Sequence, residues 1–186
     1  MKKHTLAFVD IEATGLDPFR AEILEVGIVL AEQRTDDTGK HFLEKIGEHN
    51  IQLIPEHIHT ADPKALEVCK YHKRDWSLAV PQKQGLQEVA KLLQGSVLVA
   101  QNVGFDWAFL QKAGHDYGID FDAVVHYHKL DLASMAFGKL YHDEALFKFS
   151  LREMTVYFEV TNINAHTALS DARATFEVCK KLLYLP

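Results

Sequence analysis

Two carboxylic acids separated by one residue, Asp10 and Glu12, lie near the start of the chain in an otherwise apolar run. On a β-strand, alternate side chains share a face, so both carboxylates would point the same way as Leu6 and Phe8. Buried there without partners, they would destabilise the fold and repel each other. A bound divalent cation would remove both problems, whereas a strand end in solvent would leave both groups simply hydrated. The pair alone does not decide between these interpretations.

Two further carboxylic acids lie where helices are predicted to begin. Asp106 follows Asn102 by four residues, after a short apolar run, and ligands gather at the carboxyl ends of strands in sheets of this kind. Asp171 follows His166 by five residues and lies in the first turns of the last predicted helix. Each acid also has an ordinary explanation, because a negative charge in the first turn of a helix is favourable.

The combination of these groups is more specific than any one of them. The chain contains Asp-x-Glu-x-Thr-Gly, then Asn-x-x-x-Asp, then His-x-x-x-x-Asp, each where a strand or helix begins or ends. In this order they resemble the DEDD superfamily of 3′→5′ exonucleases and its DEDDh subgroup. That subgroup includes proofreading subunits of bacterial polymerase III, ribonuclease T and oligoribonuclease. The resemblance extends over essentially the whole chain and is closest over residues 101–110 and 166–175.

The resemblance implies a role for each of these residues. Asp10 would bridge two divalent cations, Glu12 and Asp171 would complete the shell of one, and Asp106 would reach the second through water. His166 would take the proton from the attacking water. The positions that match those holding the terminal nucleotide in the family are Thr14, Gly15, Leu16, Asn102 and Phe105.

The chemistry of phosphodiester cleavage agrees with such a site. The reaction needs an activated water, stabilisation of transition-state charge and support for the leaving 3′ oxygen, and two ions about 3.5–4 Å apart can supply all three. Hard oxygen ligands favour Mg²⁺ or Mn²⁺. An imidazole is a suitable base near neutral pH. We therefore expect release of nucleoside 5′-monophosphates from the 3′ ends of single-stranded DNA or RNA. The alternative is a catalytically silent nucleic-acid-binding module of the same fold.

The elements that must position these residues can be predicted from apolar periodicity and turn residues. Three strands are expected over residues 5–12, 22–33 and 40–53, joined by turns as a meander. Helices are expected over residues 84–94, 105–115, 132–140, 151–158 and 168–183, with strands over 96–101 and 123–129. Asp131 and Ser150 are predicted helix N-caps, and Thr167 or Asn164 could cap the last helix. The pattern is α/β, and the resemblance implies a ribonuclease H-like fold with a mixed five-stranded sheet flanked by helices.

The composition of the chain bears on the number of domains, on nucleic-acid binding and on membrane association. With 186 residues, 47% of them apolar, the chain is expected to form a single exonuclease domain over residues 1–186. The net charge of −6 does not exclude a nucleic-acid enzyme, because a carboxylate-rich metal site is acidic and bound cations reverse its local sign. No apolar stretch is long enough to span a bilayer, and the two cysteines offer no disulfide framework. We expect a cytoplasmic protein without membrane association.

A basic cluster and two histidine pairs each allow more than one interpretation. Residues 70–74 form a basic cluster that could contact phosphates, with Tyr71 and Trp76 available for base stacking, although a solvated helix face is the favoured interpretation. The pairs His57/His59 and His126/His128 lack a third ligand nearby, so zinc is not expected.

The assembly state is also open. Many relatives have histidine where this chain has Gln101, which changes no predicted metal ligand. A homodimer and a loose association with a polymerase are both compatible with the resemblance. Because the chain ends soon after its last predicted helix, a stand-alone or loosely associated trimming enzyme is expected.

Overall fold

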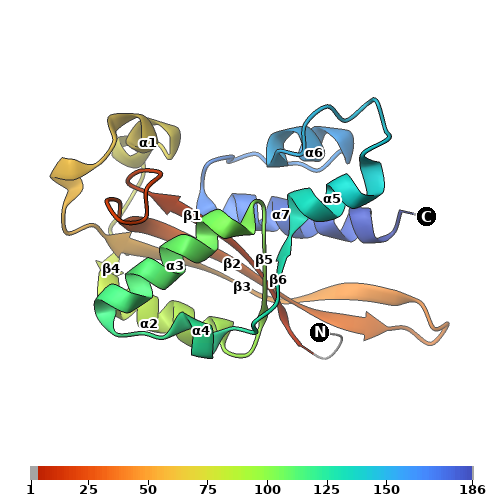
Figure 1. The fold of residues 1–186 in the computed structure, drawn as a ribbon, viewed down its shortest axis with the longest axis horizontal. Helices are drawn as coiled ribbons and strands as arrows, with labels where there is room; N and C mark the ends of the chain where they lie inside the picture. Colours follow the sequence, from red (N-terminus) through yellow and green to blue (C-terminus); the bar gives the residue numbers. More distant parts are fainter. Residues whose placement is uncertain (1–3, 186) are drawn as a thin grey trace.

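The computed structural model describes residues 4–185, which form a mixed sheet with helices on both faces (Figure 1). The strands are β1 (Leu6–Ala13), β2 (Ile23–Thr35), β3 (His41–Ile54), β4 (Val80–Pro81), β5 (Val97–Ala100) and β6 (Lys129–Asp131). Their order in the sheet is β4-β3-β2-β1-β5-β6. Strands β1, β2 and β3 pair antiparallel, which confirms the predicted meander, and β5 and β6 continue the sheet in parallel with β1.

The predicted five-stranded sheet is wrong by one strand. The additional strand is β4, which pairs in parallel with the end of β3 and contains two residues. Apolar alternation predicts a strand only over several residues, so a segment this short leaves no pattern to detect.

Seven helices and two single 3₁₀ turns surround the sheet within the described residues. The helices are α1 (Pro63–Val68), α2 (Gln82–Leu93), α3 (Val103–Tyr117), α4 (Phe121–Val124), α5 (Leu132–Leu140), α6 (Leu151–Tyr157) and α7 (Ala168–Leu183), and the 3₁₀ turns are η1 (Ile58–Thr60) and η2 (Tyr71–Lys73). None of these helices combines the length and the apolar character that crossing a bilayer would require.

The two faces of β1 pack into two different cores, as its alternation predicts. Leu6 and Phe8 face α5, α6 and α7, and the Phe8 and Phe176 rings meet edge to face with centroids 5.2 Å apart. Val9 and Ile11 pack on the other side with residues of α2 and α3. Asp10 and Glu12 therefore continue the row that faces α7, at the end of β1 where the apolar packing stops.

Helix α7 lies unusually close to the sheet at its first turn. A Cβ atom on Gly27 of β2 would lie 2.2–2.3 Å from backbone atoms of Ala168 and Leu169, so only glycine fits there. Gly27 is also the residue paired with Asp10 across the β1–β2 ladder. This close approach of α7 to the sheet is thus beside the first candidate metal ligand.

The predicted strand over residues 123–129 is wrong at its start. Residues Phe121–Val124 form α4, whose N-cap Asp120 accepts a hydrogen bond from the Ala123 amide at 3.2 Å, and β6 begins only at Lys129. Phe121 and Val125 are both buried in the core beneath α2 and α3. A short apolar run fits a buried helical turn and a strand equally well, so periodicity could not separate them.

Asp131 is the N-cap of α5, as predicted, and it caps a second helix as well. One carboxylate oxygen accepts hydrogen bonds from the Ser134 amide and hydroxyl at 2.7 and 2.6 Å. The other accepts from the Val103 amide at the start of α3 at 2.9 Å. Partial burial acts to raise the pKa of Asp131, but these hydrogen bonds outweigh it and lower the pKa. One side chain thus fixes the beginnings of α3 and α5, which cover opposite faces of the sheet.

Candidate active site

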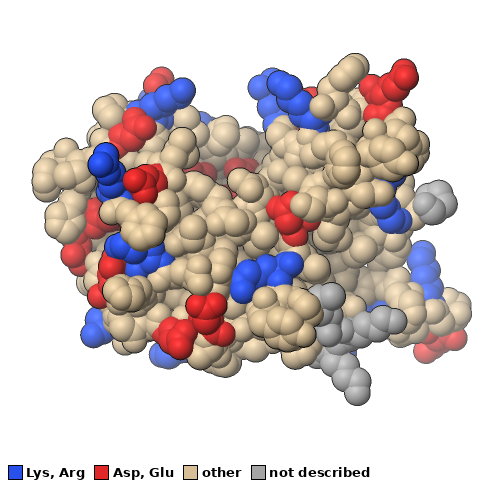
Figure 2. Space-filling view, viewed as in Figure 1, with Lys and Arg blue, Asp and Glu red and all other residues tan. Residues whose placement is uncertain are grey.

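A pocket of about 320 Å³ opens at the carboxyl end of β1, beside α1 and the first turns of α3 and α7. Figure 2 shows the hollow between the part of the molecule that contains α1 and the part that contains α5 and α6, with acidic side chains at its floor. The lining residues are Asp10, Ile11, Glu12, Ala13, Gly15, Leu16, Asp62, Lys64, Ala65, Val68, Phe105, His166 and Asp171.

The structure brings the catalytic candidates together. Ligand atoms of Glu12, His166 and Asp171 all lie within 4.8 Å of one another. Asp10 lines the same pocket, and Asp106, which is 3% exposed and is not a lining residue, is near enough for its charge to raise the pKa of Asp10. Residues separated by up to 161 positions (10 to 171) thus meet at one point because β1, α3 and α7 converge at this edge of the sheet.

The residues expected to hold the terminal nucleotide divide into two groups. Gly15, Leu16 and Phe105 line the pocket, and the Leu16 side chain is 80% exposed. Thr14 is buried behind the pocket, where its hydroxyl accepts the Glu22 amide hydrogen at 2.8 Å.

Asn102 has a structural role at the start of α3. It occupies the N-cap position with a left-handed backbone (φ 61°) and makes no side-chain capping hydrogen bond. Asp131 supplies the hydrogen bond at this helix start instead. Neither Thr14 nor Asn102 is among the lining residues of the pocket.

A hydrogen-bond network that sequence reasoning missed orients Asp171. Asn162 donates to one oxygen of Asp171 at 2.6 Å and accepts a hydrogen bond from the Ser170 hydroxyl at 2.7 Å. The other Asp171 oxygen accepts the backbone amide of His166 at 3.0 Å. His166 itself has a left-handed backbone (φ 66°), which turns the chain immediately before α7. An isolated asparagine in a polar loop gave no signal for this role.

Glu25, a second residue missed from the sequence, fixes the start of α7. It is fully buried, and its carboxylate accepts the Ala168 amide of α7 at 2.9 Å and the Asn50 amide group at 2.8 Å. Arg74 forms an ion pair with the same carboxylate. Glu25 also faces Glu12 across the β1–β2 ladder, so this carboxylate is both an anchor for α7 and a charge beside the pocket.

The predicted cap of α7 is therefore wrong in its chemistry. Thr167 occupies the N-cap position, but its hydroxyl donates to the Asn164 carbonyl at 3.0 Å and caps no helix amide. The capping carboxylate comes from Glu25, which precedes the helix by 143 residues. Local sequence patterns cannot reveal a cap supplied from so far away.

The basic cluster at residues 70–74 is divided by the fold. Arg74 points inward to Glu25 and lies over the Trp76 ring, 4.8 Å from its centroid. The Tyr71 and Trp76 rings, 4.9 Å apart, pack beside buried Leu24. Within this cluster Lys70 reaches the loop that precedes α7, where its amine donates to the Ala165 carbonyl at 3.4 Å. The cluster is thus not a uniformly solvated face, and its two aromatic rings pack against each other.

Burial and repulsion among the carboxylates dominate the electrostatics of the pocket. Burial raises the pKa of Asp10 well above its ordinary value, and the neighbouring carboxylates of Asp106, Asp171 and Glu12 raise it further. Burial, Asp171 and Glu25 raise the pKa of Glu12 to about 7, although Arg74 and Lys70 oppose the rise. Burial likewise raises the pKa of Asp106. Without cations, some of these carboxyl groups therefore hold protons near neutral pH.

These shifts predict how the stability of the metal-free protein depends on pH. A carboxyl whose folded pKa is raised stabilises the fold most below its unfolded pKa, and this stabilisation is lost as the pH rises through the folded pKa. For Glu12 that interval runs from 4.5 to about 7. In a chelator we expect the melting temperature to fall between about pH 5 and about pH 8, and Glu12→Gln to reduce that fall. Thermal melts of both proteins across this range measure it, and a wild-type melting temperature that rises over the range would contradict the assignment of buried, repelling carboxyls.

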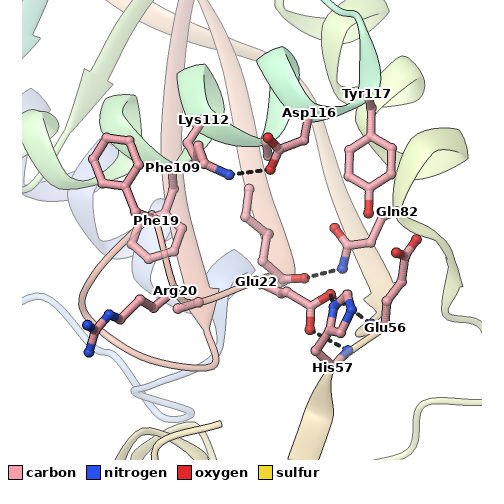
Figure 3. Close-up of a pocket in the computed structure, with 13 residues that line it drawn as sticks. Phe19, Arg20, Glu22, Glu56, His57, Gln82, Phe109, Lys112, Asp116 and Tyr117 are labelled. Atoms are coloured by element: carbon pink, nitrogen blue, oxygen red, sulfur yellow. Dashed lines mark hydrogen bonds and ion pairs between the residues drawn. The ribbon is translucent and has the colours of Figure 1, made fainter. Parts of the chain in front are cut away.

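A second hollow of about 380 Å³ lies on the other side of the loop that follows β1 (Figure 3). Ligand atoms of Glu22, Glu56 and His57 lie within 4.8 Å of one another there. The two oxygens of Glu22, however, each accept a backbone amide, from Glu56 and from His57, at 2.8 Å. Burial and a hydrogen bond to Glu56 raise the pKa of Tyr117. The Glu22 carboxylate thus closes the loop at residues 56–57, and nothing in this hollow indicates a ligand.

Comparisons with known proteins agree on one family. A family model described as "Exonuclease" matches residues 7–179. The chain is 30% identical over 175 residues to the PolC-type DNA polymerase III of Caldanaerobacter subterraneus, covering 94% of this chain and 11% of that protein. It is 26% identical over 183 residues to ribonuclease T of Wigglesworthia glossinidia brevipalpis, covering 91% of this chain and 80% of that enzyme. The chain is also 27% identical over 169 residues to the 3′-5′ exonuclease DinG of Staphylococcus haemolyticus, covering 91% of this chain and 17% of that protein.

Solved structures show the same fold. Exonuclease I of E. coli in complex with a dT13 oligonucleotide superposes with a TM-score of 0.77 at 19% identity, covering 98% of this chain and 41% of that one. The zinc-bound complex of the same enzyme with single-stranded DNA gives a TM-score of 0.76 at 18% identity, covering 96% of this chain and 40% of that one. The described fold is therefore ribonuclease H-like, as expected, and the chain spans less than half of these two structures.

Proposed function

Because the chain belongs to the DEDD exonuclease family, we propose that it is a divalent-metal-dependent 3′→5′ exonuclease of the DEDDh subgroup, acting on single-stranded nucleic acid. The observation that carries the proposal is the convergence of Asp10, Glu12, Asp171 and His166 on one pocket, with Asp106 buried beside it. In this proposal residues 1–186 form a single exonuclease domain.

The donor set supports Mg²⁺ or Mn²⁺ as the cofactor. No Lys or Arg within residues 4–185 forms a salt bridge with Asp10, Glu12, Asp106 or Asp171, although burial and mutual repulsion raise the pKa of the first three. Hard carboxylate oxygens in such a cluster suit these cations. Asp10, surrounded by the other carboxylates, would bridge two ions, with Glu12 and Asp171 on one and Asp106 toward the other. When bound, the ions supply water activation, charge stabilisation and support for the leaving oxygen.

The side chains then divide the remaining work. His166 is exposed at the pocket, with a ligand atom within 4.8 Å of the carboxylates of Glu12 and Asp171, and takes the proton from the attacking water. Attack on the terminal phosphodiester breaks its bond to the 3′ oxygen of the preceding nucleotide and releases a nucleoside 5′-monophosphate. Leu16 and Phe105 bound the terminal nucleotide on opposite walls, and Gly15 lets the backbone approach it.

The primary test is hydrolysis of single-stranded oligonucleotides labelled at either end, with Mg²⁺ or Mn²⁺ and with a chelator. A 3′→5′ exonuclease releases a 3′ label at once as a mononucleotide and shortens a 5′-labelled strand stepwise. Matched DNA and RNA strands, and oligonucleotides of two to five nucleotides, identify the preferred substrate. Tight binding with no metal-dependent product would instead support the silent binding module.

Removal of the proposed base gives a separate prediction. His166→Ala should lower turnover by about 10²–10⁴-fold, the usual contribution of general base catalysis, while Mn²⁺ continues to raise the melting temperature. The matched control is His115→Ala, at an exposed position near the end of α3, which should retain wild-type turnover. Unchanged turnover in His166→Ala would remove this residue as the base.

The same proposal covers location and assembly. We expect the enzyme in the cytoplasm, as a monomer, a homodimer or loosely associated with a polymerase. Sedimentation of the purified chain, alone and with a replicative polymerase, distinguishes these three states.

A further inference from the structure

We propose that Lys64 and Lys70 form a phosphate-binding site at the mouth of the catalytic pocket, which holds the backbone of the substrate strand next to the bond that is cleaved. The inference rests on the proposed exonuclease function and names the part of the substrate that these residues contact.

Lys64 places a free positive charge on the pocket wall. It is the second residue of α1 and, among the described residues that line the pocket, the one lysine or arginine. Its backbone amide donates to Asp62 at 2.9 Å, but its amine has no hydrogen bond or ion pair with another described residue. By contrast, Lys45 and Lys180 are paired with glutamates on their own elements. The Lys64 charge is therefore available to a ligand.

Lys70 places a second positive charge beside the pocket: it lines a neighbouring hollow on the other side of α1, and its side chain reaches the loop before α7. Its backbone is left-handed (φ 56°), immediately before η2, and its amine donates to the Ala165 carbonyl at 3.4 Å. Ala165 directly precedes His166, so the ammonium group lies beside the loop that carries the proposed base. Its charge also opposes the rise in the pKa of Glu12. A contact of 3.4 Å to one carbonyl leaves the other ammonium hydrogens free for a second acceptor.

The charges favour a polyanion as the ligand. The four carboxylates at the floor of the hollow are neutralised when two divalent cations are bound, which leaves Lys64 and Asp62 as charged residues on the pocket wall and Lys70 beside it. The Asp62 carboxylate accepts the Lys64 backbone amide at 2.9 Å, and the two lysines outnumber this one carboxylate. Figure 2 shows Lys and Arg side chains, with acidic side chains among them, on the α1 side of the hollow. A single-stranded nucleic acid carries one phosphate per nucleotide, and lysine binds phosphate as a compact point charge.

The test uses Lys64→Gln, Lys70→Gln and the double variant, with Lys91→Gln on α2 as the control outside the pocket. For cleavage of a single-stranded oligonucleotide, each single variant should raise KM about fivefold, with the larger part of the effect in KM rather than in kcat. The slope of log KM against log salt should decrease by about 0.7 for each lysine removed, because each phosphate contact releases counterions. Glutamine retains a donor for the Ala165 carbonyl, so loss of a purely structural tether would not reproduce the change in salt slope.

Binding measured without cleavage separates this inference from the proposed function. The anisotropy of a fluorescein-labelled oligo(dT) in Ca²⁺ should show weaker, less salt-dependent binding for the lysine variants, whether or not the wild type cleaves. Wild-type affinity and salt slope in the double variant would overturn the inference. So would a fall in kcat at unchanged KM and salt slope. Absence of cleavage by wild type, with the binding differences intact, would overturn the exonuclease proposal and support the phosphate site.

Discussion

Replacing Asp10 with asparagine is expected to lower turnover of a 3′-labelled oligonucleotide by about 10³-fold or more, equivalent to about 4 kcal/mol of transition-state stabilisation. Asp10 is the carboxylate whose pKa is raised, after burial, by Asp106, Asp171, Glu12 and Glu25 together, so it lies at the centre of the acidic cluster. Asparagine keeps the shape of the side chain but removes the negative charge through which Asp10 would hold two cations.

The same variant should have the opposite effect on stability. Without metal at about pH 8, Asp10→Asn should melt at a higher temperature than wild type, because it removes one of several buried, mutually repelling charges. Loss of activity combined with a gain in metal-free stability cannot arise from misfolding. Asp37→Asn, at an exposed position in the β2–β3 turn, is the control and should change neither property. Wild-type turnover in Asp10→Asn, measured with the labelled oligonucleotide, would contradict the assignment of the metal site.

The second large effect is expected from Gly27→Ala, a change of one methyl group. The added Cβ would lie 2.2–2.3 Å from backbone atoms of Ala168 and Leu169, which cannot move without displacing α7. We expect a loss of about 3 kcal/mol or more in the free energy of unfolding, at the upper end for overpacking of a core. Because α7 carries Asp171 and begins beside His166, turnover should also fall by at least about 10²-fold where the variant is still folded.

Gly138→Ala provides the matched control for that substitution. Gly138 lies in α5, and a Cβ atom there would meet nothing within 4 Å. Alanine should stabilise the helix by about 0.5–1 kcal/mol and leave turnover unchanged. Chemical denaturation and oligonucleotide hydrolysis, measured on both variants, make the comparison. A Gly27→Ala protein with wild-type stability would show that α7 does not lie against β2 as described.

Much of the fold could be predicted because its elements carry strong local patterns. The bounds of α5 and α7 were predicted to the residue, and the three strands of the meander to within two residues. Ser150 caps α6 as expected, with its hydroxyl accepting the Glu153 amide at 3.3 Å. The elements that were missed are α1, α4 and β4, whose six, four and two residues are too short to establish a period.

The sequence predicts the acidic residues and the histidine of the candidate site. It does not predict the residues that hold these side chains in place. Glu25 in β2 resembles any charge on a strand, and its role depends on Arg74 and Ala168, which are 49 and 143 residues away. Asn162 likewise matters only because the fold brings Asp171 to it. Such partners are set by tertiary contacts, for which a single sequence contains no periodicity or spacing.

The double cap at Asp131 has a consequence for the mechanics of the molecule. Its two oxygens hold the first turns of α3 and α5, so a rotation of α5 relative to α3 must stretch or break a hydrogen bond at this carboxylate. Helix α3 carries Asp106 in its first turn, and α5 lies on the side of the hollow opposite α1 (Figure 1). Thermal fluctuations that move α5 and widen the hollow are therefore coupled to displacement of Asp106, a proposed metal ligand. The width of the hollow and the positions of the proposed metal ligands should therefore change together, and the hollow should not widen while its floor stays fixed.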